Sequence, residues 1–179
     1  DFIPAPEISE IYTCSILEFY NNTKKYKKIE NVLEFGAGSG AMAFNFLNNC
    51  DPKNLPNNYY IIEKNIHLIK KQKNKLKKLS NNLYGKIIWI KDIKKIDNVF
   101  VIANEILDAI PAKFFKKDDG KFFEKSIKEE DGELVISLLD CKDHLLDEIY
   151  NIESRLGSKI PNSYSFEINF LQEKFLSKI

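Results

Sequence analysis

Three glycines at alternate positions, Gly36, Gly38 and Gly40, form the segment of this chain best suited to holding a ligand. They follow an apolar run that ends in the acid Glu34, and a helix-like pattern begins after them. A strand that turns sharply and brings its backbone against a ligand needs glycines, because a Cβ atom would block the approach. The spacing is one residue shorter than the G-x-G-x-x-G pattern of dinucleotide-binding loops. The alternative is a glycine-rich turn that only joins a strand to a helix.

Polar side chains also follow the other apolar runs. Glu63 lies about twenty residues beyond the glycines, where an acid can hold a ribose diol through two hydrogen bonds. Its alternative role is a surface acid that caps the helix expected from Asn65. Asn104 and Glu105 follow a later run, with Asp108 one turn beyond. These three stand where a parallel sheet binds ligands, although they would also suit the cap and first acids of a helix.

The elements that must position these residues alternate between strand and helix patterns. Amphipathic patterns predict helices over residues 39–48 and 65–83. Apolar runs predict strands over residues 29–35, 58–63, 86–91 and 98–104. Such alternation favours right-handed crossovers and a parallel sheet, so the sequence predicts an α/β fold.

The two ends of the chain differ from this core. The first 28 residues combine a proline-restrained segment with a helix expected over residues 7–19. After Pro111, short strand patterns separated by Asp-Asp-Gly and Glu-Asp-Gly predict an antiparallel β-meander inserted after the core. The elements expected there are strands over 112–117, 122–128 and 134–139, a helix over 142–156, a strand or loop over 163–166 and a helix over 168–176. We expect residues 1–28, the core 29–111 and the region 112–179 to form one domain.

The composition is that of an ordinary globular domain. Of 179 residues, 44% are hydrophobic and 30% are charged, and the formal net charge of +1 points neither to nucleic acid nor to an anionic membrane. No apolar run approaches the length that crosses a bilayer. The lysine-rich run 70–78 lacks interleaved aromatic residues, so a solvated helix face explains it better than a nucleic-acid site. Three distant cysteines without a C-x-x-C pair argue against a metal site or a disulfide framework and favour a reducing compartment.

Three blocks of the sequence resemble the MidA family of class I S-adenosylmethionine (SAM) methyltransferases, which includes the mitochondrial complex I assembly methyltransferases. Asp1–Ser9 is similar to the family's D-F-x-T-A-P-E-I-S, with Pro4 where the family usually has Thr. Glu34–Gly40 is similar to motif I of class I SAM methyltransferases. Ala103–Pro111 is similar to the family's A-N-E-(F/L)-(F/L)-D-A-(L/I)-P and is the most specific of the three. The resemblance extends from the first residue to about Ile168.

The resemblance implies a Rossmann-like fold that binds SAM. The glycine loop would let backbone groups approach the methionine part of SAM, and Glu34 would orient its ammonium group. Glu63 would hold the ribose hydroxyls. Asp92, just after the third predicted strand, is a candidate for the adenine edge, with an ordinary loop acid as the alternative.

The resemblance also implies an arginine acceptor in a protein substrate, because the mitochondrial members of the family methylate protein arginines. Asn104, Glu105 and Asp108 would face this acceptor, since paired carboxylates can hold a planar guanidinium through forked, charge-assisted hydrogen bonds. Asp1 and Glu7 are expected to line the same mouth.

The chain begins at Asp1 rather than Met, and family members continue into further strands, so we expect an internal fragment with an incomplete sheet. Its compartment would be the cytoplasm in a bacterium or the mitochondrial matrix in a eukaryote. A second hypothesis is a non-catalytic assembly factor that binds SAM and holds a partner, such as a respiratory complex I subunit. A third is a nicotinamide-dependent oxidoreductase, which the short glycine spacing and the lack of a proton-transferring His or Tyr near the motifs disfavour.

Overall fold

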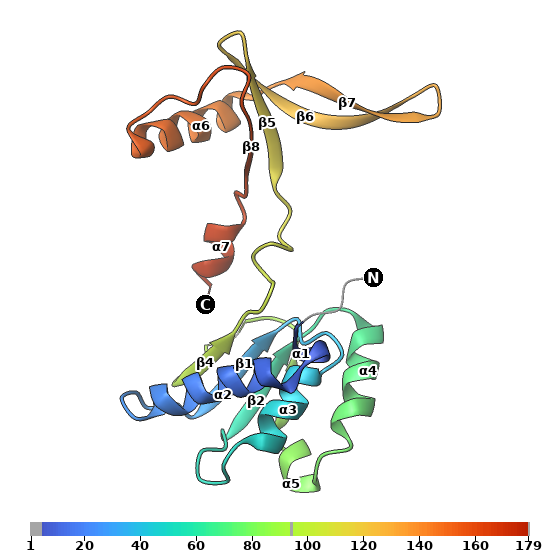
Figure 1. The fold of residues 1–179 in the computed structure, drawn as a ribbon, viewed down its shortest axis with the longest axis vertical. Coiled ribbons are helices and arrows are strands. Elements are labelled where there is room, and N and C mark those ends of the chain that lie inside the picture. The colour runs from blue at the N-terminus through green and yellow to red at the C-terminus, as the bar shows by residue number, and fades with distance from the viewer. Residues whose placement is uncertain (1–4, 94, 179) are drawn as a thin grey trace. The chain divides into compact units, whose positions relative to one another are not determined.

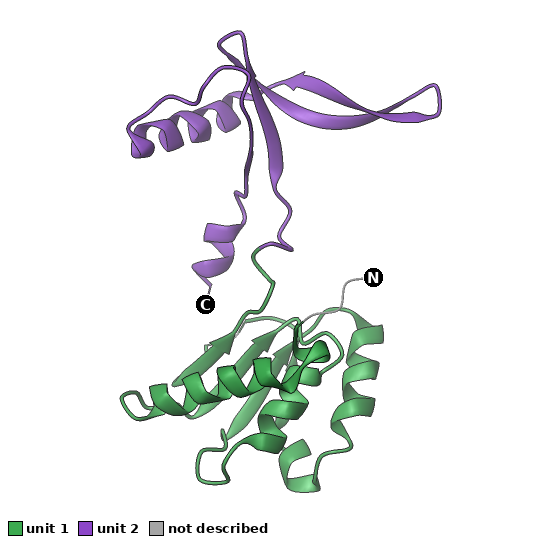
Figure 2. Cartoon of the chain, in the orientation of Figure 1, with its two compact units in different colours: residues 1–107 green, residues 108–179 purple. Residues whose placement is uncertain are grey.

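The computed structural model describes residues 5–93 and 95–178. The chain divides into two compact units, Asp1–Leu107 and Asp108–Ile179, which are coloured separately in Figure 2. The division falls four residues before the boundary at 111 that the sequence predicts between core and meander. The expectation of a single domain stays a prediction, and each unit is described by itself below.

The first unit is built on a four-stranded parallel sheet with the strand order β3-β2-β1-β4 (Figure 1). Its strands are β1 (Asn31–Phe35), β2 (Asn58–Ile62), β3 (Ile87–Ile90) and β4 (Val99–Ile102). Each lies within one of the four predicted ranges, because continuous apolar runs favour strands that are covered by other elements. The sheet confirms the predicted Rossmann-like α/β class, and the parallel pairing brings the carboxyl ends of all four strands to one edge.

Helices α2 (Glu10–Lys24) and α3 (Ala41–Asn49) cover one face of this sheet (Figure 1). An aromatic cluster joins the two helices to each other and to the sheet. The ring of Phe46 in α3 lies edge-on to that of Tyr20 in α2, with 5.1 Å between centroids, and to that of Tyr59 in β2, at 5.6 Å. All three side chains are fully buried, and such edge-to-face pairs add to the stabilisation from burial alone.

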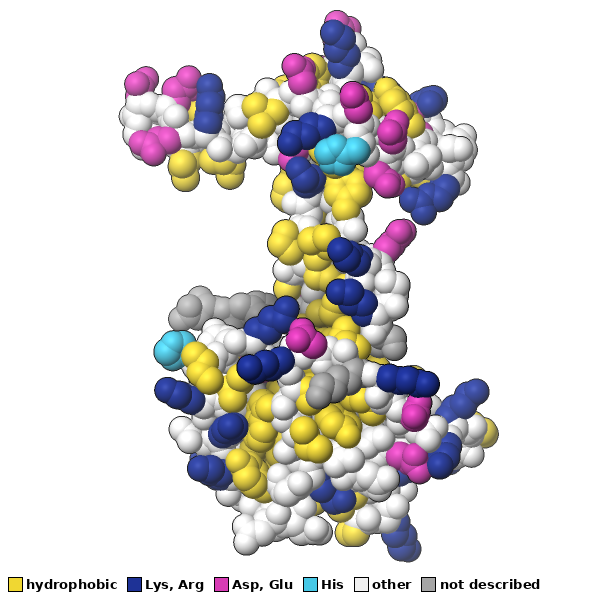
Figure 3. All heavy atoms as spheres, turned by 180° about the vertical axis from the view of Figure 1, so that it is seen from behind, with side chains coloured by type: hydrophobic (Ala, Val, Ile, Leu, Met, Phe, Trp, Pro, Cys, Tyr) yellow, Lys and Arg dark blue, Asp and Glu magenta, His cyan; other side chains and the backbone are white. Residues whose placement is uncertain are grey.

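The opposite face of the sheet is also apolar. Alternation along the strands places Leu33, Tyr60, Ile88 and Val101 on this face, in register across all four strands. Leu33 is buried, whereas the side chain of Ile88 in β3 is exposed. Seen from behind in Figure 3, apolar side chains gather on the first unit, and lysines and acids are interspersed around them.

Two of the predicted helices are each divided by a serine. The helix expected over residues 7–19 is split into α1 (Ala5–Ile8) and α2, because the hydroxyl of Ser9 accepts a hydrogen bond from the backbone N–H of Ile11 at 3.2 Å and caps α2. The helix expected over residues 65–83 becomes α4 (Ile66–Leu76) and α5 (Asn81–Tyr84). Ser80 caps α5 through the N–H of Leu83, so the prediction of one long helix is wrong.

The second unit confirms the predicted meander. Its antiparallel sheet has the order β7-β6-β5-β8, formed by β5 (Lys113–Asp118), β6 (Lys121–Glu130), β7 (Glu133–Asp140) and β8 (Ser165–Ile168). The Asp119-Gly120 and Asp131-Gly132 turns both have positive φ at their two central residues, as two-residue hairpins require.

Helix α6 (Asp143–Leu156) packs on this sheet, with Leu145 and Ile149 buried against Phe115 and Phe122. Helix α7 (Gln172–Leu176) begins four residues later than the helix expected over residues 168–176. Ile168 pairs with β5 as the end of strand β8, and Oδ1 of Asn169 accepts hydrogen bonds from the N–H groups of Leu171 and Gln172. No helix in the described part of the chain has the length and hydrophobicity needed to cross a membrane.

Candidate functional site

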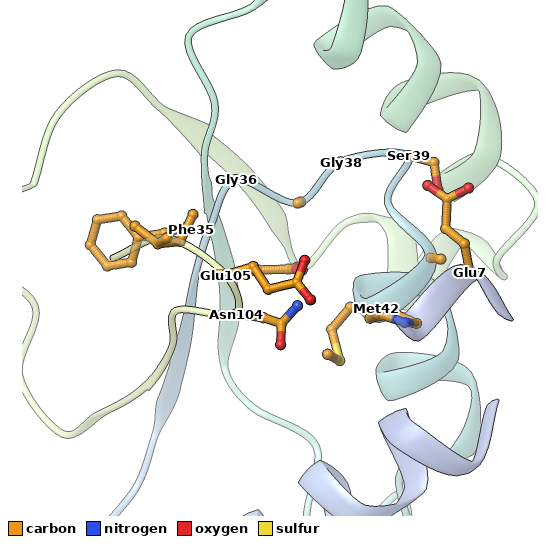
Figure 4. A pocket seen from close by; sticks show the side chains of 13 residues that line it. Glu7, Phe35, Gly36, Gly38, Ser39, Met42, Asn104 and Glu105 are labelled. Carbon is orange, nitrogen blue, oxygen red and sulfur yellow. The ribbon is translucent and has the colours of Figure 1, made fainter. Parts of the chain in front are cut away.

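A cavity of about 150 Å³ opens at the carboxyl edge of the parallel sheet, within the first unit. Its lining comes from the end of β1, the glycine loop, the start of α3, helix α1 and the turn after β4. Figure 4 shows Asn104 and Glu105 on one side of this cavity, and Met42 and Glu7 on the other. The cavity therefore brings together parts of all three sequence blocks, Asp1–Ser9, Glu34–Gly40 and Ala103–Pro111.

The glycine loop bends back on itself at this edge. Gly36, Gly38 and Gly40 all have positive φ, of 60°, 53° and 84°, a conformation that residues with a Cβ rarely adopt. The N–H of Gly36 donates to the carbonyl oxygen of Ile62 at 2.9 Å, which holds the loop to the end of β2. At Gly38, the nearest heavy atom to an ideal Cβ among the described residues, chain neighbours aside, is Oε1 of Glu7 at 4.0 Å. The Gly38 backbone thus faces open space in the cavity.

Glu34 lies at the base of the cavity and is 4% exposed. The hydroxyl of Tyr59, from the neighbouring strand β2, donates a hydrogen bond to its Oε2 at 2.9 Å. Burial raises the pKa of the Glu34 carboxyl to about 7, and the hydrogen bond from Tyr59 opposes this rise. The carboxyl can therefore change its charge near neutral pH at the point where the glycine loop begins.

Ser39 contributes a buried hydroxyl to the same lining. The residue is 5% exposed, and its Oγ has no hydrogen-bond partner among the residues that the structure describes. A buried hydroxyl without a partner costs free energy, so such groups usually have a partner supplied by water or a ligand. Ser39 thus offers the cavity an unsatisfied donor and acceptor.

Asn104 and Glu105 form a turn after β4, and residues 103–110 contain no helix. The alternative in which Asn104 caps a helix is therefore wrong. The hydroxyl of Tyr12, in α2, donates a hydrogen bond to Oδ1 of Asn104. Glu105 has a φ of +51°, an uncommon conformation for a residue with a side chain, and its exposed carboxylate lines the cavity.

Glu63 follows β2 at the same edge and is half-buried. Its Oε1 accepts hydrogen bonds from the backbone N–H groups of Lys64 and Asn65, both at 2.9 Å, just before α4 begins. Its Oε2 accepts one from Nε2 of Gln72 at 3.2 Å. Glu63 thus holds the turn before α4 but does not cap the helix, because the cap is Asn65, whose Oδ1 accepts a hydrogen bond from the N–H of His67 at 2.9 Å. Because a carboxylate can accept about four hydrogen bonds, Glu63 keeps capacity for a ligand hydroxyl, and its ribose role stays a prediction.

The other predicted site residues are less closely associated with the cavity. Asp92 is exposed two residues after β3, and neither Asp92 nor Glu63 belongs to the described lining. Asp108 is exposed in a turn at the start of the second unit. Asp1 lies outside the described residues. The cofactor role of Asp92 and the acceptor roles of Asp108 and Asp1 stay predictions.

Four residues near the site were not predicted from the sequence. Tyr12 and Tyr59 lie within an expected helix and an expected strand, and the only sequence signal for their roles is that a buried tyrosine hydroxyl usually needs a polar partner. Ser39 was assigned only to the start of a helix. Gln72 offered a clearer signal, because it lies at helical spacing between the apolar residues Ile69 and Leu76, on the stripe that faces the core.

The fold is shared with two solved structures. One is a "COG1565 superfamily member and likely methyl transferase" from Burkholderia thailandensis, bound to S-adenosyl-homocysteine, with a TM-score of 0.83 and 21% identity. The other is a native structure of an uncharacterized COG1565 superfamily protein from the same organism, with a TM-score of 0.82 and 22% identity. The similarity covers 99% of this chain, which spans 45% and 47% of the length of the two structures. At these identities it establishes the fold.

Among curated proteins, none matches the chain. A family model described as "Putative S-adenosyl-L-methionine-dependent methyltransferase" matches residues 13–179, which is most of the chain. SAM is thus the cofactor of the matched family. The chain belongs to this family of S-adenosyl-L-methionine-dependent methyltransferases.

Proposed function

We propose that this chain provides the SAM-binding and catalytic part of a methyltransferase that modifies arginine side chains in a protein. One observation carries the proposal. A single cavity is lined by the glycine loop and Glu34 on the cofactor side, and by Asn104 and Glu105 on the side assigned to the acceptor. Methyl transfer needs donor and acceptor to be aligned at close range with water excluded, and one shared cavity meets that need.

The residues present fit SAM. Gly38 leaves its backbone open to the cavity, and the buried Ser39 hydroxyl lacks a partner among the described residues. Glu34, once ionised, can hold an ammonium group by a charge-assisted hydrogen bond. SAM, when bound, supplies an activated methyl group. Glu63 is assigned to the ribose hydroxyls and Asp92 to the adenine edge, both in keeping with their places after β2 and β3.

The acceptor side suits a cation. The Glu105 carboxylate is exposed and lines the cavity, and Glu7 lies across from it (Figure 4). Carboxylates bind a guanidinium through forked, charge-assisted hydrogen bonds, and Asn104 adds an amide that Tyr12 holds in place. When the nitrogen of a guanidinium takes the methyl group, the bond from that methyl to the sulfonium sulfur would break and a neutral thioether would leave. The nitrogen would also lose a proton, which a nearby carboxylate can accept, and the same carboxylate would stabilise the positive charge before that transfer. Asp108 and Asp1 are assigned to the same acceptor region.

The resemblance to the MidA family favours a protein substrate among respiratory complex I subunits, and hence a role in assembly of that complex. The competing function is a non-catalytic factor that binds SAM and holds its partner. The chain has acids assigned both to the cofactor and to the acceptor, Glu34, Glu63, Glu105 and Asp108. This favours an enzyme, because a factor that only holds a partner does not need acids on both sides of the site.

Calorimetric titration of the protein with SAM and with NAD tests the cofactor. We expect saturable binding of SAM alone, and saturable NAD binding without a SAM response would overturn the proposal.

Transfer of labelled methyl from SAM to arginine-containing peptides then separates an enzyme from a holding factor. We expect Glu105→Gln and Asp108→Ala to lower this rate at least tenfold, with unchanged SAM affinity. Glu18→Gln, which removes an exposed acid of α2, is the control and should match the wild type.

A further inference from the structure

One polar side chain is fully buried on an otherwise lysine-rich helix. Gln72 lies in α4 between the exposed residues Lys71 and Lys73, yet its own side chain is 0% exposed. A primary amide carries two donor hydrogens and an acceptor oxygen, and burying them without partners is costly. The contacts of Gln72 therefore show what this amide is placed to do.

The Gln72 amide connects three separate segments of the first unit. Its Nε2 donates to the carbonyl oxygen of Gly38 at 3.0 Å and to Oε2 of Glu63 at 3.2 Å. Its Oε1 accepts a hydrogen bond from Nε1 of Trp89, in β3, at 2.9 Å. The amide thus joins the glycine loop, the end of β2 and β3.

The chemistry of the partners fixes which way the amide points. An indole N–H can only donate, so Trp89 requires the amide oxygen on its side. A carbonyl and a carboxylate can only accept, so Gly38 and Glu63 require the NH₂ group on theirs. The backbone adds a further constraint, because an ideal Cβ at Gly40 would lie 3.4 Å from Cα of Gln72, and α4 therefore passes close to the loop.

We propose that Gln72 is a positioning residue that sets the Glu63 carboxylate and the glycine loop at a fixed separation. In the function proposed above, on which this inference rests, Glu63 holds the ribose and the glycine loop accommodates the methionine part of SAM. One amide then aligns the two ends of the cofactor site, and Trp89 holds that amide in its working orientation. Gln72 itself need not touch the cofactor.

The variant Gln72→Glu keeps the shape of the side chain and an acceptor for Trp89, but it removes both donors and brings a second carboxylate next to Glu63. We expect it to weaken SAM affinity about tenfold or more, because a lost hydrogen bond to a charged partner and a like-charge contact act together. Trp89→Phe leaves Gln72, the glycine loop and the site acids unchanged. It removes only the indole N–H that donates to the amide oxygen of Gln72. We expect a several-fold weaker affinity from this variant.

If Gln72 served only to stabilise the fold, its variants would lower the unfolding temperature and leave the affinity for SAM unchanged. Leu79→Ala serves as the matched control, because Leu79 is buried in the same core, follows α4 and makes no polar side-chain contact. The Leu79→Ala variant should have a lower unfolding temperature than the wild type and the same affinity for SAM.

Adenosine, which carries the ribose but no methionine part, provides a second readout. The affinity of the protein for adenosine should fall in Gln72→Glu and in Glu63→Gln. The double variant should lose less binding free energy than the two single variants lose together.

The outcomes separate the two proposals. Wild-type protein that fails to bind SAM overturns the proposed function itself. Wild-type protein that binds SAM, together with Gln72→Glu and Trp89→Phe variants that bind it equally well, overturns only the positioning role. If Gln72→Glu does not fold, as judged by far-ultraviolet circular dichroism, Trp89→Phe and the neutral variant Gln72→Met decide the question by the same titration.

Discussion

At Glu34, burial and a hydrogen bond act in opposite directions on one carboxyl group. Burial among the strands raises its pKa from the ordinary value of 4.5 to about 7, and the hydroxyl of Tyr59 favours the charged form. The pKa of Tyr59 is itself raised, first by burial and then by the charge of Glu34. The pair thus keeps a proton-binding group at the base of the cavity, where a ligand cation can displace that proton.

This pKa predicts a specific pH dependence of stability. Between pH 4.5 and about 7 the folded chain retains a proton on Glu34 that the unfolded chain has released, so the free energy of unfolding falls as pH rises through this window. The loss amounts to about 3 kcal/mol if the whole shift is realised. Relative to the variant Glu34→Gln, which cannot ionise, the wild type should therefore lose stability from pH 5 to 7 and remain level above pH 8.

Urea unfolding of both proteins at intervals across this range measures the difference. Other titrating groups are common to the two proteins and cancel in the comparison. A difference in unfolding free energy that stays constant from pH 5 to 8 would show that Glu34 ionises in the folded chain as it does in an unfolded one.

At the scale of elements, the loop between β1 and α3 combines a left-handed backbone conformation, which glycine adopts without strain, with open space. Gly38 has a φ of +53° and lines the cavity. Gly132, in the turn between β6 and β7, has a φ of +82°, and chain neighbours aside no heavy atom of a described residue lies within 4 Å of an ideal Cβ there. Both positions impose the same left-handed conformation, but only the first lies next to the proposed ligand.

We predict that Gly38→Ala and Gly132→Ala each lower the free energy of unfolding by about 1–2 kcal/mol, the usual cost of a left-handed residue with a Cβ. Only Gly38→Ala should also weaken SAM binding, by about tenfold, because its new methyl group enters the cavity. Denaturant unfolding and calorimetry on the two variants provide the two measurements. Equal SAM affinity in both would show that the loop does not approach the cofactor.

The boundaries of elements were harder to predict than their types. All four parallel strands and the first three strands of the antiparallel sheet, β5 to β7, were predicted, because apolar runs and Asp-Gly turns are local signals. The breaks at Ser9 and Ser80 were not, because a serine within an amphipathic pattern can either continue a helix or cap a new one. Packing of the segments on either side decides between these two outcomes.

At the scale of the whole molecule, the cavity belongs entirely to the first of the two compact units. A ligand stabilises the part of a protein whose unfolding destroys its site. We predict that saturating SAM slows amide hydrogen exchange in residues 35–42 and 104–106, while exchange in residues 121–140 of the second unit stays unchanged. Mass spectrometry of peptides with and without SAM tests this, and NAD at the same concentration is the control. Equal protection of both units would mean that they unfold together.

The sequence by itself determined the parallel core, the glycine turn and the acids that follow the strands, because hydrophobic period and turn chemistry act over a few neighbouring residues. Only the tertiary structure decided that Glu34 is buried under Tyr59, that Asn104 is held by Tyr12, and that Gln72 joins the glycine loop to Glu63. Each of these contacts links residues far apart in the chain or on separate elements. Their burial and hydrogen-bond partners depend on how the elements pack together, and the pattern of neighbouring residues in the sequence does not determine that packing.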